Sequence, residues 1–228
     1  MLDIEQIVSY YPPHLRTFRK NLLREYLQYR ILQIIYDSPS GIHLCFMGGT
    51  AAHIVYGVDR FSEDLDFDNL GLGQEDWEKL ADTLMRELQR HGYSPECKTV
   101  FRHAYHTHIK FPDVLFDAGI AGHRHARLTI RVNAEPQEFQ YRPDTFLLNK
   151  FDVFSLIRTT PAPLLLAEKI CAILTRKRTL GRDFYDTSFL LGKTEPDYEY
   201  LASRGGIPDK TRHSFSRPGP GHSRPRPH

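Results

Sequence analysis

Apolar residues recur at helical spacing over two long stretches of the chain. The stretch from Pro13 to Tyr36 ends in a dense apolar run, so we expect a helix that packs into the core. The stretch from Glu75 to His91 carries its larger apolar residues on one side, and Gly92 follows it, as is common after helix C-termini. The pattern therefore predicts two long core-facing helices.

Shorter apolar runs predict strands. Residues 42–47 form a run bounded by glycines, which is typical of a buried strand, and residues 64–68 alternate polar and apolar positions. A short helix is expected between these strands, over Ala51 to Tyr56. Further strands, mostly antiparallel or mixed, are predicted at Tyr93–Lys98, Tyr105–Phe111, Val114–Phe116 and Arg127–Ala134.

Two more helices are expected, over Pro161–Thr175 and Arg182–Leu191. The order of elements predicts an α/β or α+β enzyme core followed by a helical segment. We expect the core, with its N-terminal helix, over residues 1–140 and the helical segment over 141–202. Residues 203–228 are rich in Pro, Gly and basic residues and are expected to be disordered, because they cannot offset their ordering entropy.

Composition narrows the class of protein. The chain has no apolar run of about 18 residues and no signal-like start, so we expect a cytoplasmic protein that does not enter a membrane. Cys45, Cys97 and Cys171 are isolated among apolar neighbours, which favours buried free thiols over disulfides or zinc ligands. The formal charge of +2 arises in the tail, where residues 203–228 hold six Lys/Arg and one Asp. We interpret the abrupt change of composition there as a shifted reading frame or a truncation.

The stretch from 48 to 68 is the most informative part of the sequence. Gly48 and Gly49 at a strand-to-helix turn let the backbone approach a ligand closely. We expect the Thr50 hydroxyl and the first amides of the new helix to point at a triphosphate. Taken alone, this signal also fits a tight turn capped by Thr50.

Carboxylates follow this turn. Asp64 and Asp66 lie two positions apart on the expected strand and therefore project to the same side. Like charges held that close need a cation between them, and Mg²⁺ is expected because it prefers oxygen ligands and substrate phosphates. A solvated acidic strand is the alternative for these two residues alone. The order of turn, short helix and paired carboxylates favours metal-assisted nucleotidyl transfer.

Cations lie further along the chain. Lys169 falls on the helix expected over residues 161–175, and Arg182 comes directly before Asp183. Cations of this kind suit the charge that develops on a phosphoryl group. The alternatives are a solvent-facing lysine and a carboxylate that stabilises the helix dipole. Arg60 and Ser62 are further candidates for phosphate contact.

Two regions resemble the AbiEii/AbiGii abortive-infection nucleotidyltransferases, which are toxins of bacterial toxin–antitoxin systems. The first runs from Gly48 to Phe67 and the second from Leu165 to Asp186. The resemblance covers about residues 10–202 and implies a polymerase-β-like nucleotidyltransferase fold. It also implies a nucleoside triphosphate donor, an acceptor expected to be tRNA, and an antitoxin partner.

The resemblance assigns roles to individual residues. Asp64 and Asp66 are expected to hold Mg²⁺, and Asp183 to complete the site by orienting Lys169 or the base. The residues implied in binding the triphosphate are Gly48, Gly49, Thr50 and Lys169.

One position departs from the family pattern. Polymerase-β-like enzymes place a third carboxylate on a neighbouring strand as the base for the acceptor hydroxyl, and this chain has Asn133 there. Glu135 follows, and we expect it to face the opposite side of the sheet unless a bulge brings it round. A catalytically degenerate protein that binds a nucleotide or an antitoxin is therefore an alternative function.

Two other functions have weaker support in the sequence. A zinc site could use the clustered His103, His106 and His108, but no Cys or acidic partner matches them. A nucleic-acid-binding module could use the basic tail, but the rest of the chain is near neutral and offers no aromatic stacking platform.

Overall fold

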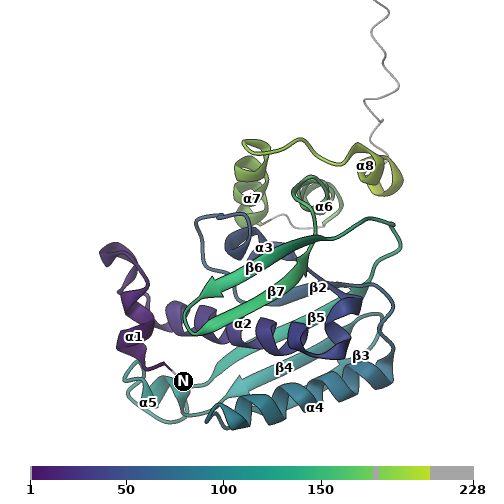
Figure 1. Ribbon diagram of the computed structural model, residues 1–228. Coiled ribbons are helices and arrows are strands. Elements are labelled where there is room, and N and C mark those ends of the chain that lie inside the picture. The colour runs from purple at the N-terminus through teal and green to yellow at the C-terminus, as the bar shows by residue number, and fades with distance from the viewer. Residues whose placement is uncertain (1, 177–179, 206–228) are drawn as a thin grey trace, which may run out of the picture.

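The computed structural model describes residues 2–176 and 180–205, which form a seven-stranded sheet in the order β3-β4-β5-β2-β1-β7-β6 (Figure 1). The β1–β7 and β2–β5 pairs are parallel and the other four pairs are antiparallel. The strands are β1 Leu44–Met47, β2 Leu65–Asn69, β3 Glu96–Phe101, β4 Tyr105–Phe111, β5 Leu128–Pro136, β6 Asp144–Lys150 and β7 Val153–Thr159.

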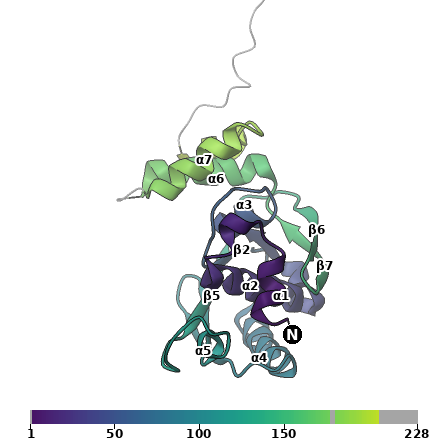
Figure 2. The same ribbon diagram turned by 90° about the vertical axis from the view of Figure 1, so that its left-hand side faces the viewer.

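Helices cover one face of the sheet and lie above one of its ends. Helix α2 crosses in front of the sheet with α4 below it (Figure 1), and α6 and α7 lie together above the sheet (Figure 2). The α-helices are α1 Ile4–Ser9, α2 Arg19–Asp37, α3 Gly48–Ile54, α4 Gln74–Arg90, α5 Val114–Asp117, α6 Ala162–Thr175, α7 Gly181–Leu191 and α8 Tyr198–Gly205. Two short 3₁₀ helices are η1 Pro13–Leu15 and η2 Pro39–His43.

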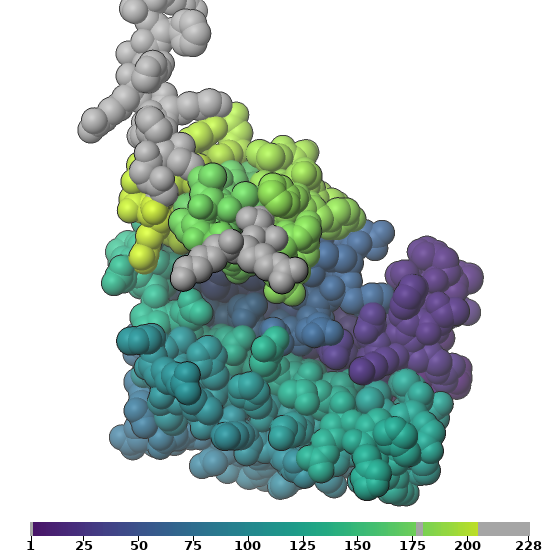
Figure 3. Space-filling model, turned by 180° about the vertical axis from the view of Figure 1, so that it is seen from behind, coloured from purple at the N-terminus to yellow at the C-terminus, as the bar shows by residue number. Residues whose placement is uncertain are grey.

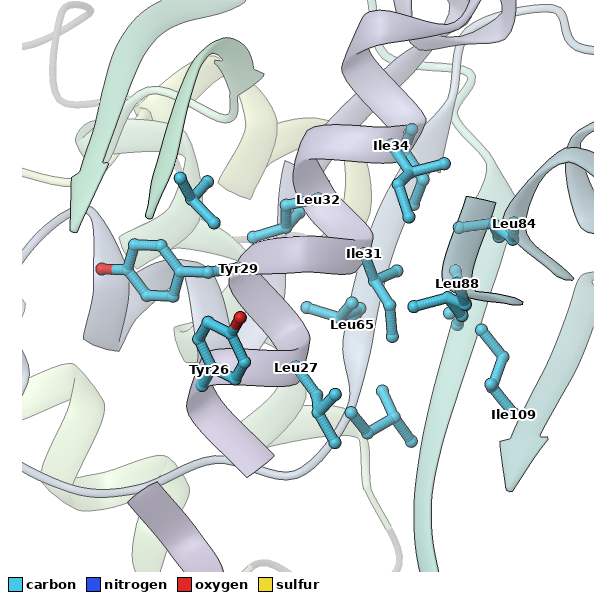
Figure 4. Close-up of a cluster of buried hydrophobic side chains, with 14 of the residues drawn as sticks. Tyr26, Leu27, Tyr29, Ile31, Leu32, Ile34, Leu65, Leu84, Leu88 and Ile109 are labelled. Carbon is cyan, nitrogen blue, oxygen red and sulfur yellow. The ribbon is translucent and has the colours of Figure 1, made fainter. Parts of the chain in front are cut away.

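Helix α2 is the centre of the core and is buried on nearly every side. Ile31 and Ile34 point toward Leu84 and Leu88 of α4 (Figure 4), while Leu65 of β2 lies under the same helix. Each such aliphatic side chain contributes about 1.5–3 kcal/mol when fully removed from water. The α2–α4 layer therefore supplies much of the stabilisation of the sheet.

Buried charges on α2 are paired with residues from distant parts of the chain. Glu25 is 2% exposed, and it accepts from His53 Nε2 at 3.0 Å and from Lys150 Nζ at 2.7 Å. Arg30 pairs with Asp152 in the β6–β7 turn at 2.6 Å. Pairing of this kind is required because an unpaired buried charge is strongly destabilising.

The mixed α/β fold and its strongest elements are confirmed. The predicted helix at 75–91 is α4, and the strand predicted at Tyr105–Phe111 is β4. The first long helix starts at Arg19 rather than at Pro13, because residues 13–15 form the separate turn η1.

The strand predicted at Val114–Phe116 is wrong, since these residues belong to the one-turn helix α5. Asp113 before it adopts a left-handed conformation with φ 60°, which turns the chain away from β4. Of the three residues in this short apolar run, Leu115 is the one that is buried. The apolar composition of the run suggested a strand, whereas its backbone forms one turn of helix.

The segment predicted to be helical over residues 141–202 begins instead with the β6–β7 hairpin, and β7 pairs with β1 of the core sheet. Apolar side chains on the outward face of the hairpin, Leu147, Phe154 and Leu156, hide the alternation that would predict strands. Its turn contains Phe151 at φ 61°, a position where glycine or asparagine would normally signal a hairpin.

The burial of the cysteines and the start of the C-terminal tail also differ from their predictions. Cys97 on β3 is exposed, so the expectation of three buried thiols is wrong for this residue, while Cys45 and Cys171 are buried. Residues 203–205 belong to α8 rather than to the tail, and the rest of the predicted disordered tail lies outside the described residues.

Both ring nitrogens of His53 face acceptors, since Nδ1 lies 2.8 Å from the Val58 carbonyl and Nε2 faces Glu25. Burial alone would lower the pKa of His53, but Glu25 and this carbonyl raise it above its usual value. Burial alone would likewise raise the pKa of Glu25, but hydrogen bonds from His53 and Lys150 hold it below its usual value. Both shifts favour the ionised form of the pair.

This pair predicts a stability that depends on pH. Because the folded pKa of His53 is raised, its contribution is complete below the unfolded pKa of about 6.5 and is lost as pH rises through the folded pKa. We expect His53→Gln to flatten the decline in the free energy of unfolding above about pH 6.5, measured with urea. The exposed His14→Gln variant is the control, and parallel profiles for wild type and His53→Gln would contradict the prediction.

Candidate active site

The Gly-Gly turn between β1 and α3 lies directly against the carboxylate strand. Gly48 has φ +78°, and a Cβ atom there would lie 2.7 Å from Asp66 Oδ2. A Cβ atom on Gly49 would lie 2.7 Å from Arg60 Nη2 and 3.1 Å from Ser62 Oγ. Glycine is therefore favoured at 48 by backbone conformation and close approach, while a side chain at 49 would displace the Arg60 guanidinium.

The register between β2 and β5 sets the carboxylates beside polar residues of the neighbouring strand. Asp66 is opposite Asn133, and Asn133 Nδ2 donates to Asp66 Oδ1 at 2.9 Å. Asp64 precedes β2 and accepts two hydrogen bonds from Arg131, at 2.9 and 2.6 Å. Asp64 and Asp66 thus face the same side of the sheet, as the alternation predicts.

The two carboxylates are held in different electrostatic environments. Burial raises the pKa of Asp66, and the hydrogen bond from Asn133 and the charge of Lys169 offset only part of this rise. The guanidinium of Arg131 neutralises Asp64, whose side chain is 25% exposed. Asp66 Oδ2 has no hydrogen-bond partner among the described residues, and it faces the space that the missing Gly48 side chain leaves open.

Asp68, further along the same strand, belongs to a separate network. It accepts hydrogen bonds from Gln137 at 3.1 Å and from the Tyr141 hydroxyl, and its side chain is buried. It does not line the cavity described below.

Glu135 differs from its prediction, because it faces the same side of the sheet as Asn133. The strand β5 continues regularly to Pro136, with Asn133 opposite Asp66 and Glu135 opposite Asp68. Residues 133 and 135 are two positions apart, so no bulge is needed to bring Glu135 to the site. Its side chain is exposed and lines the cavity.

Thr50 also differs from its prediction. Its side chain is completely buried, and its hydroxyl donates to the backbone carbonyl of Asp64. The hydroxyl therefore does not point toward a phosphate site. It instead fixes the start of β2 relative to α3.

A buried carboxylate on α7 gathers the cations of the site. Asp186 is 0% exposed and accepts from Arg60 Nε and Nη2, both at 2.6 Å, and lies 2.9 Å from Lys169 Nζ. Burial opposes ionisation, but the hydrogen bond from Arg60 and the charge of Lys169 hold the pKa of Asp186 below its usual value. Asp186 thereby positions two cations that lie far apart in the sequence, Arg60 before β2 and Lys169 on α6.

Asp183 was expected to orient Lys169, but it pairs with Arg176 at 2.8 Å. Asp186 has the predicted role instead, because it lies one helical turn further along α7 and faces Lys169 directly. Asp183 is 2% exposed and anchors Arg176 at the edge of the cavity.

A single open cavity of about 230 Å³ brings most of these residues together. Gly48, Gly49, Asp64 and Asp66 form one wall, and α6 and α7 supply the other. The cations that line it are Arg60, Lys169, Arg176 and Arg182. The arrangement presents carboxylates for a metal ion on one side and cations for phosphates on the other.

Glu168 is a further acidic residue of this cavity. Its Oε2 atom is buried without a hydrogen-bond partner among the described residues, and burial raises its pKa well above the usual value. Glu168 precedes Lys169 on α6. Its spacing in the sequence does not distinguish it from an ordinary helix carboxylate, so it could not be predicted as a site residue.

Several site residues were not predicted from the sequence. Arg131, two positions before Asn133 on the same strand, could have been found by extending the alternation backwards from Asn133. Asp186 could have been found from its spacing of three residues after Asp183, which places both on one helix face.

The clustered histidines do not form a metal site. His106 Nδ1 lies 2.9 Å from Asn133 Oδ1 and so fixes the orientation of that amide. In the part of the chain that the structure describes, no group of three or more His, Cys, Asp or Glu side chains is placed to hold a metal ion.

The sheet, the Gly-Gly turn and the paired carboxylates define a nucleotidyltransferase-like fold, which solved structures share. JHP933 from Helicobacter pylori superposes with a TM-score of 0.53 at 20% identity, over 81% of this chain and 72% of that chain. A second H. pylori structure, of a candidate nucleotidyltransferase, gives 0.53 at 20% identity over 81% and 74%. An antigenic nucleotidyltransferase-like protein from Paracoccidioides brasiliensis gives 0.47 at 17% identity over 76% and 79%.

The chain belongs to the AbiEii family of nucleotidyl transferase toxins of type IV toxin–antitoxin systems, whose family model matches residues 30–218. The match continues past residue 202, where the resemblance was expected to end. No curated protein matches the chain significantly. None of the helices in residues 2–176 and 180–205 is long and apolar enough to cross a membrane.

The Gly48 contact predicts a specific loss of stability. Gly48→Ala combines a positive φ with a Cβ contact of 2.7 Å to Asp66, so we expect a loss of about 2–4 kcal/mol in urea unfolding. Gly92→Ala is the matched control, because Gly92 has φ +84° with nothing within 4 Å of its Cβ position. Equal losses in the two variants would contradict a contribution from the Asp66 contact.

Proposed function

We propose that this chain transfers a nucleoside monophosphate from a nucleoside triphosphate to tRNA in a Mg²⁺-dependent reaction, and that it acts as a cytoplasmic toxin paired with an antitoxin. The observation that carries the proposal is the single cavity in which Asp64 and Asp66 face the cations of α6 and α7. Membership of the AbiEii family supports the toxin role and the antitoxin partner.

The donor set of the cavity fits a magnesium ion. Asp66 Oδ2 is unpartnered among the described residues and borders space that a Cβ at Gly48 would fill. Burial raises the pKa of Asp66, and a cation beside it would lower that pKa and so favour the ionised form. Asp66 and Asp64 would hold the ion, Asp64 by giving up the two hydrogen bonds that it accepts from Arg131 in this structure. When bound, the ion supplies charge stabilisation to the phosphates and the attacking oxygen.

The other residues of the cavity bind and orient the donor. Lys169 and Arg60, held by Asp186, neutralise the triphosphate, and Arg176 and Arg182 extend the cationic wall. Gly48 and Gly49 let the backbone approach the phosphates closely. Thr50 stabilises this turn because its hydroxyl donates to the backbone carbonyl of Asp64.

Glu135 is the base that we assign to the acceptor. Its carboxylate takes the proton of the acceptor hydroxyl, whose oxygen then bonds to the α-phosphorus as the bond to the β-phosphate oxygen breaks and pyrophosphate leaves. Asn133 cannot accept this proton, and its amide instead donates to Asp66. Glu135 lies two residues further along β5 and on the same face as Asn133.

A second candidate function follows from Asn133 itself. If Glu135 does not act as the base, the chain is a degenerate member of the fold that binds a nucleotide or an antitoxin without transfer. Triphosphate binding without labelled product would identify this function.

The central test is incubation of the purified chain with bacterial tRNA, Mg²⁺ and each labelled nucleoside triphosphate in turn. We expect label on tRNA from one donor, and at least about a 10²-fold loss in Asp66→Asn because the metal-binding charge is removed. Asp68→Asn is the matched control, since Asp68 is on the same strand but outside the cavity. Equal activity of Asp66→Asn and wild type would contradict the assigned site.

The role of Glu135 has a separate test. We expect Glu135→Gln to lower the transfer rate by about 10²-fold while leaving triphosphate binding unchanged, because only proton transfer is removed. Binding is measured by the shift in melting temperature with added triphosphate and Mg²⁺. The exposed Glu138→Gln is the control on the same segment, and full activity of Glu135→Gln would exclude Glu135 as the base.

A further inference from the structure

The face of β3, β4 and β5 that lies opposite α4 carries a row of basic side chains leading to the candidate active site. In the register of the sheet, Lys98 is opposite His108 and His108 is opposite Arg131. Arg131 in turn donates two hydrogen bonds to Asp64. Since neighbouring strands lie about 4.8 Å apart, the row spans about 10 Å from Lys98 to Arg131.

Positive charge on this face is only partly neutralised. Lys110 is the diagonal neighbour of Lys98 on the adjacent strand, and in the described residues neither lysine has a carboxylate within 4.0 Å. Glu96, opposite Lys110, is paired with Arg127 at 3.2 Å. Like charges at diagonal positions repel, so an anion bound across them would be stabilised.

This face is open to solvent. Helices α2 and α4 lie on the other side of the sheet (Figure 1), against the buried residues Thr107, Ile109 and Ile130. Seen from behind, the blue-green and teal part of the chain forms much of the lower surface (Figure 3). Lys98 and Arg131 are exposed, and His108 and Lys110 are half-buried.

We propose that this surface, formed by Lys98, His108, Lys110 and Arg131, binds the phosphate backbone of the acceptor RNA and leads its end to Asp64 and Asp66. The inference rests on the proposed function and names the surface that the acceptor uses. A polyanion fits the unpaired lysines, and continuity with the carboxylates favours the acceptor over an acidic protein. Contacts to phosphates position an RNA without reading its sequence.

The experiment measures binding of fluorescently labelled tRNA to the full chain by anisotropy at several salt concentrations, without nucleoside triphosphate. The test variant is Lys98→Gln/Lys110→Gln, and the charge-matched control is Lys79→Gln/Arg86→Gln on the exposed side of α4. We expect the test variant to bind about tenfold more weakly, with a salt slope smaller by about 1.4–1.8. The control is expected to bind like wild type.

Several outcomes would overturn the inference. These are no tRNA binding by wild type, unchanged affinity and salt slope in the test variant, or an equal loss in the control. Displacement of tRNA by polyglutamate at the same charge concentration would assign the surface to acidic proteins instead.

Because no donor is present, the result is independent of catalysis. A chain that binds tRNA through this surface but never transfers a nucleotide would contradict only the proposed function. A chain that transfers nucleotides while the test variant binds tRNA normally would contradict only the surface.

Discussion

The buried carboxylate of Asp186 joins the two halves of the candidate active site. Its two oxygens accept from Arg60, which precedes β2, and from Lys169 on α6, while its own helix α7 closes the cavity. A buried carboxylate in this position is tolerated only when paired, and removal of Asp186 would leave Arg60 and Lys169 without the counter-charge that they share. The distance between the carboxylate strand and the cationic helices is therefore fixed by this one group.

Hydrogen bonds from β5 orient the two carboxylates of the site, Asp64 and Asp66. Arg131 neutralises Asp64, and His106 orients the amide of Asn133 toward Asp66. Each carboxylate thus has one partner from β5, and the register of β2 with β5 determines both pairings. The site is preorganised by the sheet rather than by mobile loops, which favours precise placement of reacting groups.

The sequence predicted those parts of the fold whose periodicity is undisturbed. The amphipathic stretch of α4 and the alternation of β4 were found with nearly correct bounds, and the Gly48–Asp66 stretch identified the turn and the carboxylates. The β6–β7 hairpin was missed because Leu147 and Phe154 face outward yet are apolar, which removes the signal of a strand with one buried face.

The sequence did not predict which distant side chains pair with one another. Asp183 and Asp186 are both acidic, both on α7 and both buried, and only the three-dimensional arrangement assigns Lys169 to the second. The same holds for Thr50, whose hydroxyl could face a ligand or the backbone until the position of Asp64 is known. Glu135 shows the opposite case, since its face follows from counting residues along β5.

The polar contacts of α2 have a consequence for cooperativity. Glu25 accepts from Lys150 at the end of β6 as well as from His53, and Arg30 pairs with Asp152 in the β6–β7 turn. Tyr36 donates to the carbonyl of Arg158 at 2.6 Å. Polar side chains of α2 thus find hydrogen-bond and ion-pair partners more than a hundred positions later in the chain. We therefore expect residues 1–140 and the hairpin to unfold together, because a fragment ending near residue 140 would leave Glu25 without Lys150 and Arg30 without Asp152.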